Sequence, residues 1–309
     1  MALYSNIYFK PNCIMKLIYL ALPLLLIQSC IGQPVEQIPT NNDDNTLLWE
    51  ISGNHLSKPS YLFGTFHLMC KEDIHFSKGL TNAVRNAEEV YFEMDLDDPA
   101  NTLGAIFFMN MKEGKTLKDL YTTIEYARLK TYFTDSLDMP FAMLQRMKPN
   151  FLEALLYPKM MPCRNMSGVE EELMKIAKDQ KKEIKGFETI AFQASVFDSI
   201  PYTSQAKDLL KTIDSMDMYK KYFDTMLIVY KTQQLTEMET MFTKSEFGME
   251  ENRDILLDGR NKNWVEQLSG ILPKKNIFMA VGAGHLVGEK GLISLLRKAG
   301  YTLRPLLNK

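Results

Sequence analysis

Histidine and cysteine are scarce in this chain, and neither sign of charge is in clear excess. The 309 residues include four histidines and four cysteines, and 36 basic side chains face 38 acidic ones, for a net charge of −2. Nucleic-acid-binding proteins usually carry a basic patch, so we expect no nucleic-acid partner. Apolar residues make up 46% and charged residues 24%, as in ordinary folded proteins. Chemistry that needs an imidazole or a thiol therefore has few candidate residues.

The chain also lacks an apolar run of the roughly 20 residues that a membrane-spanning helix needs. Its longest such run, residues 17–27, follows Lys16 and precedes Gln28-Ser29-Cys30. This pattern is typical of a secretory signal, and residues 27–30 resemble a bacterial lipobox, in which cleavage exposes the cysteine for lipid attachment. We therefore expect a lipoprotein signal peptide over residues 1–29, with Cys30 lipidated. The alternatives are cleavage elsewhere, with Cys30 incidental, and a true start at Met15.

If the signal peptide is removed on export, the mature chain consists of a tether and a folded domain. Residues 30–46 are rich in Pro, Gln, Asn and Asp and are expected to form a tether. Residues 47–307 are expected to form a single domain, held to the membrane of the bacterial cell envelope by the lipid. The residues after Cys30 include no acidic run, which favours the periplasmic face.

Only Cys70 and Cys163 remain after removal of the signal peptide and lipidation of Cys30. In an oxidising compartment two remaining thiols favour a single disulfide. The alternative is that one of the two cysteines is a nucleophile.

Strand and helix patterns alternate at both ends of the domain, around helical stretches. Short apolar, β-branched or aromatic runs predict strands, at residues 47–51, 61–63, 90–94, 183–186, 277–281 and 301–303. Helices are expected over residues 79–89, 167–180, 202–247, 253–268 and 288–299, with further Met-rich helices over 100–160. The helix from 167 is expected to begin with a capping box made by Ser167 and Glu170. The fold class is therefore α/β, with a mixed central sheet flanked by helices and carrying helical insertions.

Two strands run into the same short motif, Gly-x-x-His. Residues 61–63 lead into Gly64 and His67, and residues 277–281 lead into Gly282 and His285. A glycine lets the backbone approach a ligand closely, and a histidine three residues later lies just beyond the carboxyl end of its strand. In open α/β sheets that edge is where ligands bind.

Two further strands end in acidic residues, Glu93 and Glu188. Two imidazoles and a carboxylate make the ligand set of a catalytic divalent-metal site, with Asp95 as a reserve ligand. The alternative is that the glycines serve turns and the histidines are partly buried hydrogen-bonding residues. His55 and His75 are expected to be solvated.

The whole set of motifs resembles the TraB/PrgY/GumN family, whose animal relatives are the Tiki metalloproteases. The matching features run in the family's order from about residue 47 to 305. They are residues 48–51, 61–67, 91–95 and 186–189, the pair Arg260-Asn261, and residues 282–286. The resemblance implies an erythromycin-esterase/ChaN-like fold and a metal-dependent peptidase. It also implies a divalent metal (Mn, Co or Zn) and a peptide or protein substrate.

The resemblance, carried over position by position, implies that His67, His285 and Glu93 are metal ligands. Glu188 becomes a general base or an orienting residue, and Arg260, beside Asn261, is assigned to negative charge on the substrate carbonyl oxygen. The alternative for Arg260 is a surface or salt-bridging arginine. Two other functions stay open: a protein that sequesters a peptide or haem-like ligand, and a metal-independent esterase-like hydrolase.

Methionine is unusually frequent, with 20 residues, and many lie in the helical stretches. Flexible thioethers suit adaptable surfaces, so these helices are candidates for a lid or groove over a peptide. The alternative is ordinary core packing. The residues concerned are Met139, Met143, Met147, Met160, Met161, Met216, Met218, Met226, Met238 and Met241.

Overall fold

The computed structural model describes residues 39, 43–95, 108–243 and 252–309. The expected signal peptide, Cys30 and most of the tether lie outside these residues. None of the helices in the described part has both the length and the apolar character that crossing a bilayer requires.

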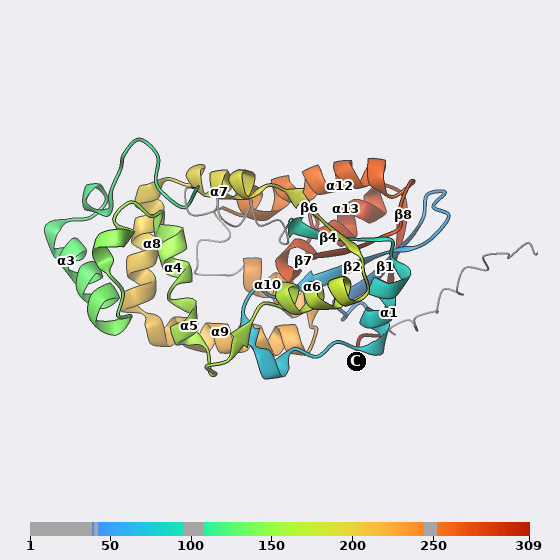
Figure 1. Cartoon of the computed structure of the whole chain (residues 1–309), viewed down its shortest axis with the longest axis horizontal. Helices are drawn as coiled ribbons and strands as arrows, with labels where there is room; N and C mark the ends of the chain where they lie inside the picture. Colours follow the sequence, from blue (N-terminus) through green and yellow to red (C-terminus); the bar gives the residue numbers. More distant parts are fainter. Residues whose placement is uncertain (1–38, 40–42, 96–107, 244–251) are drawn as a thin grey trace, which may run out of the picture. The chain divides into compact units, whose positions relative to one another are not determined.

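A six-stranded mixed sheet forms the centre of the domain (Figure 1). Its strand order is β6-β4-β7-β2-β1-β8, and the four neighbours β6, β4, β7 and β2 are parallel, whereas β1 and β8 add on in antiparallel fashion. This confirms the predicted α/β class and all six expected strands. Their bounds are β1 Leu48–Gly53, β2 Ser60–Thr65, β4 Glu89–Met94, β6 Glu183–Glu188, β7 Ile277–Gly282 and β8 Tyr301–Pro305.

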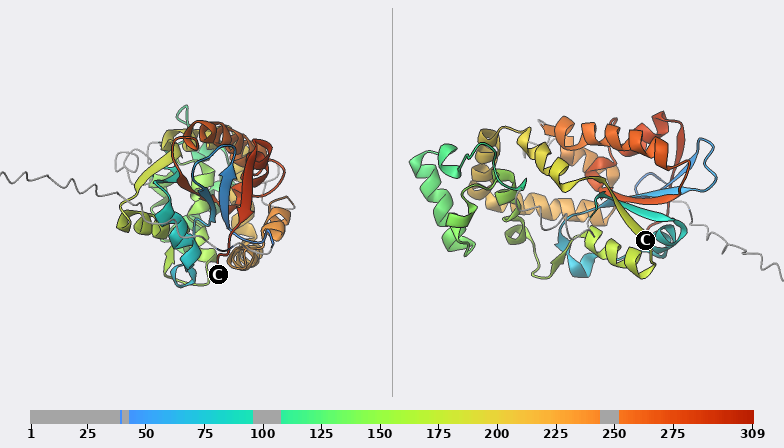
Figure 2. Two further views of the ribbon diagram at one scale, coloured as in Figure 1. Left: turned by 90° about the vertical axis from the view of Figure 1, so that its right-hand side faces the viewer. Right: turned by 45° about the horizontal axis from the view of Figure 1, so that its top comes forward.

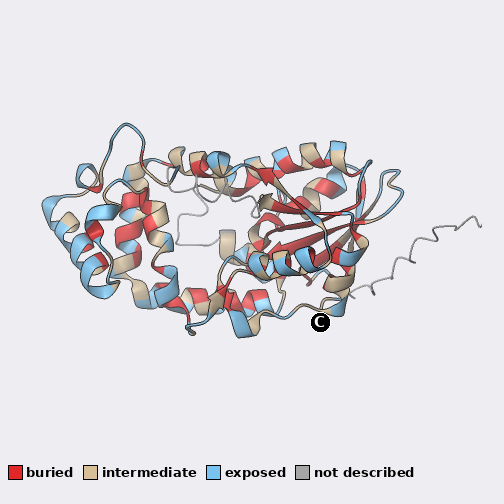
Figure 3. Ribbon diagram, in the orientation of Figure 1, coloured by how far each residue is buried: buried red, intermediate tan, exposed pale blue. Residues whose placement is uncertain are grey.

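The central strands are apolar because helices cover both faces of the sheet. All six residues of β2 and the first five of β7 are buried, as expected for central parallel strands (Figure 3). Helices α12 and α13 lie over one face, and α1 and α6 lie over the other (Figures 1 and 2). These four helices span α1 Lys78–Asn86, α6 Val169–Asp179, α12 Gly259–Ile271 and α13 Leu292–Lys298.

Two helical insertions follow β4 and β6 in the sequence. Their helices are α3 Thr123–Thr131, α4 Pro149–Ala154, α5 Tyr157–Met160, α7 Ile190–Asp198, α8 Tyr202–Asp214, α9 Met216–Lys231 and α10 Leu235–Thr243. Single turns of 3-10 or π helix are η1 Lys71–Asp73, η2 Leu117–Asp119, η3 Tyr132–Ser136, η4 Phe141–Leu144, η5 Asp254–Asp258 and η6 Ala283–His285. The stretch expected as one helical region from 202 consists of α8, α9 and α10, and residues 244–247 lie outside the described part.

The predicted capping box at Ser167 is wrong. Helix α6 begins at Val169 with Gly168 at the N-cap, and Ser167 belongs instead to the short strand β5 (Met166–Ser167), which pairs with β3 (Met69–Cys70). A Cβ on Gly168 would lie 2.8 Å from the carbonyl oxygen of His67, so only glycine allows the two segments to approach this closely.

The predicted disulfide between Cys70 and Cys163 is confirmed. Their Cα atoms lie 5.8 Å apart, and the bond joins β3 to the segment just before β5. It thereby holds together the chain that follows His67 and the chain that leads into α6.

The burial of the methionines favours core packing over a lid or groove. Three of the ten are buried and five more are partly buried against the core, which leaves Met143 and Met218 as the exposed ones. The buried three are Met160, Met161 and Met238, and the partly buried five are Met139, Met147, Met216, Met226 and Met241.

Candidate functional site

Four of the predicted site residues meet at one edge of the sheet because their strands are parallel neighbours. Glu188 ends β6, Glu93 lies one residue before the end of β4, and Gly282 ends β7. His67 follows the end of β2 by two residues. The carboxyl ends of parallel strands form one edge, as expected for a ligand site in an open α/β sheet.

Gly282 lies at the centre of this group. Its backbone N–H donates to Oε1 of Glu93 at 2.9 Å. A Cβ on Gly282 would lie 3.3 Å from that oxygen, 3.5 Å from Nε2 of His67 and 3.7 Å from Cδ2 of His285. The second glycine motif therefore leaves open a space that both histidines and the glutamate surround.

His285 is buried and held in one tautomer. Its Nδ1 lies 2.6 Å from Oδ1 of Asn261, whose amide nitrogen donates to the carbonyl oxygens of His285 and Lys290. Since the amide oxygen only accepts, Nδ1 carries the proton and Nε2 keeps its lone pair. The ring packs against Trp264 with centroids 4.5 Å apart, and burial lowers the pKa of His285 to about 3. His285 is therefore neutral, the form that binds metal.

His67 is oriented by Glu170, whose sequence position predicts a capping box instead. Nδ1 of His67 lies 2.7 Å from Oε1 of Glu170, and the hydroxyl of Thr65 donates to the same oxygen. The charge of the Glu170 carboxylate raises the pKa of His67. The ring is 72% exposed, with Nε2 directed towards Gly282. Nothing in the sequence distinguishes Glu170 from Glu171 and Glu172, which share the first turn of α6.

We expect Glu170→Gln to lower the pKa of His67 in the metal-free protein. The carboxylate stabilises the imidazolium, so a neutral amide should let the pKa fall towards its ordinary value of about 6.5. An NMR titration of the His67 ring measures this, with Glu171→Gln as the matched control. A pKa that is the same in both variants would contradict the pairing.

Arg260 is not a surface residue, because only 12% of its side chain is exposed. Nε lies 3.1 Å from both oxygens of Glu188, and Nη2 lies 2.6 Å from Glu93 and 2.8 Å from Glu188. Nη1 contacts the carbonyl oxygen of Leu256 at 3.0 Å and Nε2 of His285 at 3.3 Å. All five N–H groups of the guanidinium thus have partners. Its contact with a substrate oxygen stays a prediction, and would require one of these bonds to exchange.

The carboxylate of Glu188 is held by hydrogen bonds from three side chains. Its carboxylate accepts from Trp264 at 2.8 Å and from Gln193 at 3.0 Å as well as from Arg260, and its side chain is 1% exposed. Gln193 also donates to Glu93, at 3.2 Å. This burial favours the orienting role for Glu188 over the general-base role.

Glu93 is ionised despite its burial. Burial raises the pKa of a carboxyl group, but the positive charge of Arg260 and the hydrogen bond from the N–H of Gly282 outweigh that effect and lower the pKa of Glu93. The remaining candidates are His55, His75 and Asp95. His55 occupies an exposed turn at positive φ, His75 is exposed, and Asp95 follows β4 with its amide against Gly186.

The donor set fits a divalent metal. Each histidine holds Nδ1 against a side-chain acceptor, as metal-ligating histidines do. Nε2 of His67 faces Gly282, whereas Nε2 of His285 lies 3.3 Å from Nη1 of Arg260 and would have to exchange that contact for a metal. Nε2 of His285 lies 3.7 Å from Oε1 of Glu93. Over the described residues, donor atoms of three side chains lie within 4.8 Å of one another only at Cys70, Glu72 and Cys163, where the disulfide occupies both thiols. His67, Glu93 and His285 would therefore have to draw closer together around an ion.

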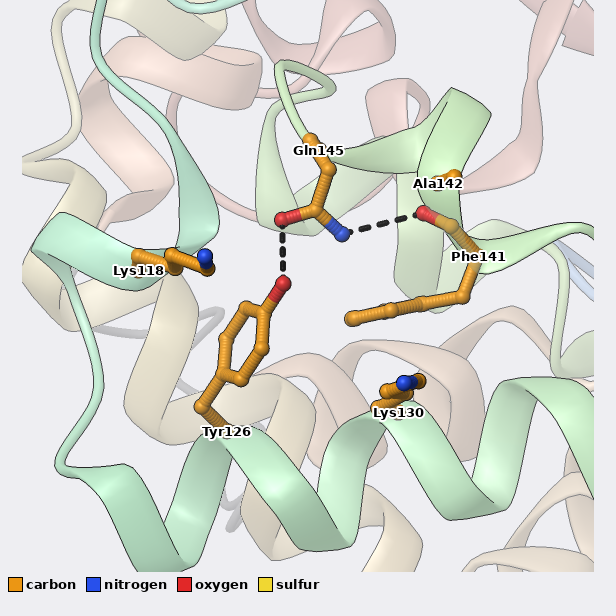
Figure 4. A pocket seen from close by; sticks show the side chains of 6 residues that line it. All are labelled: Lys118, Tyr126, Lys130, Phe141, Ala142 and Gln145. Atoms are coloured by element: carbon orange, nitrogen blue, oxygen red, sulfur yellow. Dashed lines mark hydrogen bonds between the residues drawn. The ribbon is translucent and has the colours of Figure 1, made fainter.

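Two pockets can be compared with this cluster. One of about 300 Å³ lies within the first helical insertion and contains none of the predicted site residues (Figure 4). Its lining side chains are Lys118, Tyr126, Lys130, Phe141, Ala142 and Gln145. The other, of about 480 Å³, runs along β6 and includes Glu188, so it adjoins the cluster.

The chain has similar relatives among known proteins. The chain is similar to Metalloprotease TIKI1 of Danio rerio, 22% identical over 315 residues that cover 84% of this chain and 63% of that protein. It is also similar to Metalloprotease TIKI1 of Homo sapiens, 22% identical over 329 residues that cover 85% of this chain and 62% of that protein. The chain thus spans about three-fifths of the length of these relatives. No solved structure matches it.

The match to a family model covers nearly all of the expected domain. The model of the TraB/PrgY/gumN family matches residues 47–305 of the 309, a range that includes both glycine-histidine motifs and every residue of the cluster around Gly282. The chain therefore belongs to the TraB/PrgY/gumN family.

Proposed function

We propose that this protein is a metal-dependent hydrolase that cleaves peptide bonds, with His67, Glu93 and His285 as the metal ligands. One observation carries the proposal: the two histidines and the glutamate surround Gly282, and the Nδ1 of each ring is held by an acceptor. The metalloprotease names of the similar proteins support the same reaction class.

The residues of the chain would have separate tasks in this site. Asn261 holds His285 in the metal-binding tautomer, and Glu170 orients His67. Arg260, itself held by Glu188, positions the carboxylate of Glu93 and keeps it ionised. A bound Mn, Co or Zn ion would activate water and polarise a carbonyl group.

We further propose that the protein is exported and anchored by a lipid on Cys30, on the periplasmic face. The disulfide supports this location, because disulfides persist in oxidising compartments and are rare in the cytosol of mesophiles. The signal-like residues 1–29 are the second support.

One observation favours a second candidate, a metal-independent hydrolase. An exposed histidine paired with a carboxylate, as His67 is with Glu170, is also the arrangement of a general base held by its orienting acid. The two candidates differ in whether chelation removes activity.

We expect chelation to abolish hydrolysis of a quenched fluorescent decapeptide library, and one of Mn, Co or Zn to restore it. His67→Ala should lower kcat/KM by more than about 100-fold, because losing a ligand should exceed the roughly 10–100-fold effect of losing a ligand's hydrogen-bond partner. The ring is exposed, so the fold should persist. His75→Ala is the matched control and should change neither metal content nor rate.

The outcomes separate the candidates. Full activity of the metal-free protein would contradict the metal mechanism and support His67, paired with Glu170, as a general base. Absence of cleavage with all three metals, together with unchanged metal content in His67→Ala, would overturn the proposed hydrolase.

A further inference from the structure

Among the described strands, β6 forms one edge of the sheet. In the strand order it has a single neighbour, β4, which pairs with it in parallel from Glu89 opposite Glu183 to Met94 opposite Glu188. Within the described part of the chain, the main chain of residues 183–188 has no hydrogen bond beyond this ladder. Every second residue of a strand directs its N–H and C=O away from the neighbour, so β6 presents a row of unpaired groups.

A pocket runs beside this edge. It has a volume of about 480 Å³ and is lined by residues of β4, β6 and α12. Tyr91 and Phe187, whose rings pack at a centroid distance of 5.1 Å, contribute aromatic surface, and Ile271 and Gln267 contribute from α12. A volume of this size is in the usual range of ligand pockets.

The charges at the rim are already paired. Nζ of Lys185 lies 3.1 Å from Glu89 and 3.4 Å from Glu183. Tyr91, Phe187 and Ile271 give the pocket an apolar part, and the polar side chains of Asp95, Glu188, Thr189 and Gln267 complete its lining. With its lysine neutralised, the pocket suits an uncharged side chain.

The edge leads directly to the candidate active site. Glu188 is the last residue of β6 and also lines the pocket, and it binds Arg260, which binds Glu93. A chain extended along β6 would therefore reach the cluster of candidate metal ligands at the carboxyl end of the strand.

We propose that an extended peptide adds to β6 as a seventh strand and places one uncharged side chain in this pocket. Main-chain hydrogen bonds give such complexes affinity, and pockets for alternate side chains give them selectivity. The identity of this peptide as substrate rests on the proposed function, whereas its binding to the edge does not.

The test is hydrogen–deuterium exchange of the fragment containing residues 183–188, with and without an excess of a random decapeptide pool. The pool should slow exchange of the β6 amides several-fold. Gln267→Trp, which directs an indole into the pocket, should abolish this protection. Glu266→Trp is the matched control on the exposed side of the same helix and should preserve it, and circular dichroism checks that both variants fold.

A second measurement uses decapeptides from the pool that the protein retains, each N-methylated at one position. Strand addition predicts that weakened binding recurs at every second residue, because alternate N–H groups face β6. Unchanged exchange of β6, or loss of affinity without this period, overturns the docking edge even if the protein cleaves peptides. Protection of β6 without cleavage would instead leave the docking edge standing and count against the hydrolase.

Discussion

Replacing Arg260 by methionine is expected to lower the free energy of unfolding by about 3–5 kcal/mol, the usual effect of removing one partner from a buried ion pair. Arg260 is 12% exposed, and the two carboxylates that it pairs with, those of Glu93 and Glu188, are 13% and 1% exposed. Without the guanidinium, two buried negative charges would face each other. Urea denaturation followed by circular dichroism measures the change.

A surface arginine provides the control for this experiment. Arg128 lies 3.0 Å from Asp214, but the two side chains are 50% and 47% exposed. Exposed pairs contribute about 0–1 kcal/mol, so Arg128→Met should have little effect. Equal losses for the two variants would show that Arg260 is not the centre of a buried network.

Replacing Cys70 and Cys163 together by serine is expected to lower the free energy of unfolding by about 4 kcal/mol. The cysteines are 93 residues apart in sequence, and closing a loop of that length restricts the unfolded chain strongly. The oxidised wild type, the reduced wild type and the double variant should be compared by urea denaturation. The two protein forms without the bond should agree, and a loss below about 1 kcal/mol would contradict the loop-closure argument.

The same double variant should also affect the site. Cys70 follows His67 by three residues, and the amide of Val169 donates to the carbonyl of Phe66 next to the Glu170 turn. Because the disulfide holds these two segments together, its removal should loosen the contact between His67 and Glu170. The pKa of His67 should then fall towards that of an ordinary histidine. The NMR titration described for Glu170→Gln provides the measurement.

The sheet and the meeting of its site residues were predictable from local signals. Apolar runs located the strands, and glycine followed by histidine marked where two of them end. Parallel strands share one edge, so residues more than 200 positions apart, such as His67 and His285, are expected together. The two-residue strands β3 and β5 were missed, because two residues are too short for alternation to be recognised.

The residues that hold the site in place were not predictable in this way. Glu170 has the same sequence setting as Glu171 and Glu172, and its contact with His67 joins residues 103 positions apart. Gln193 lies inside an ordinary helix, yet it donates to both Glu93 and Glu188. Arg260 was expected near substrate, and its burial between two carboxylates depends on how α12 packs against the sheet. Lipidation of Cys30 stays a prediction from the sequence.

Both helical insertions leave the sheet from the strands that carry the site acids. One follows Glu93 at the end of β4, and the other follows Glu188 at the end of β6. Apart from α7, whose Gln193 binds both acids, the helices of either insertion could be lengthened, shortened or replaced without disturbing the pairing of the six-stranded sheet. The insertions can therefore alter selectivity while the strands keep the reacting groups in place.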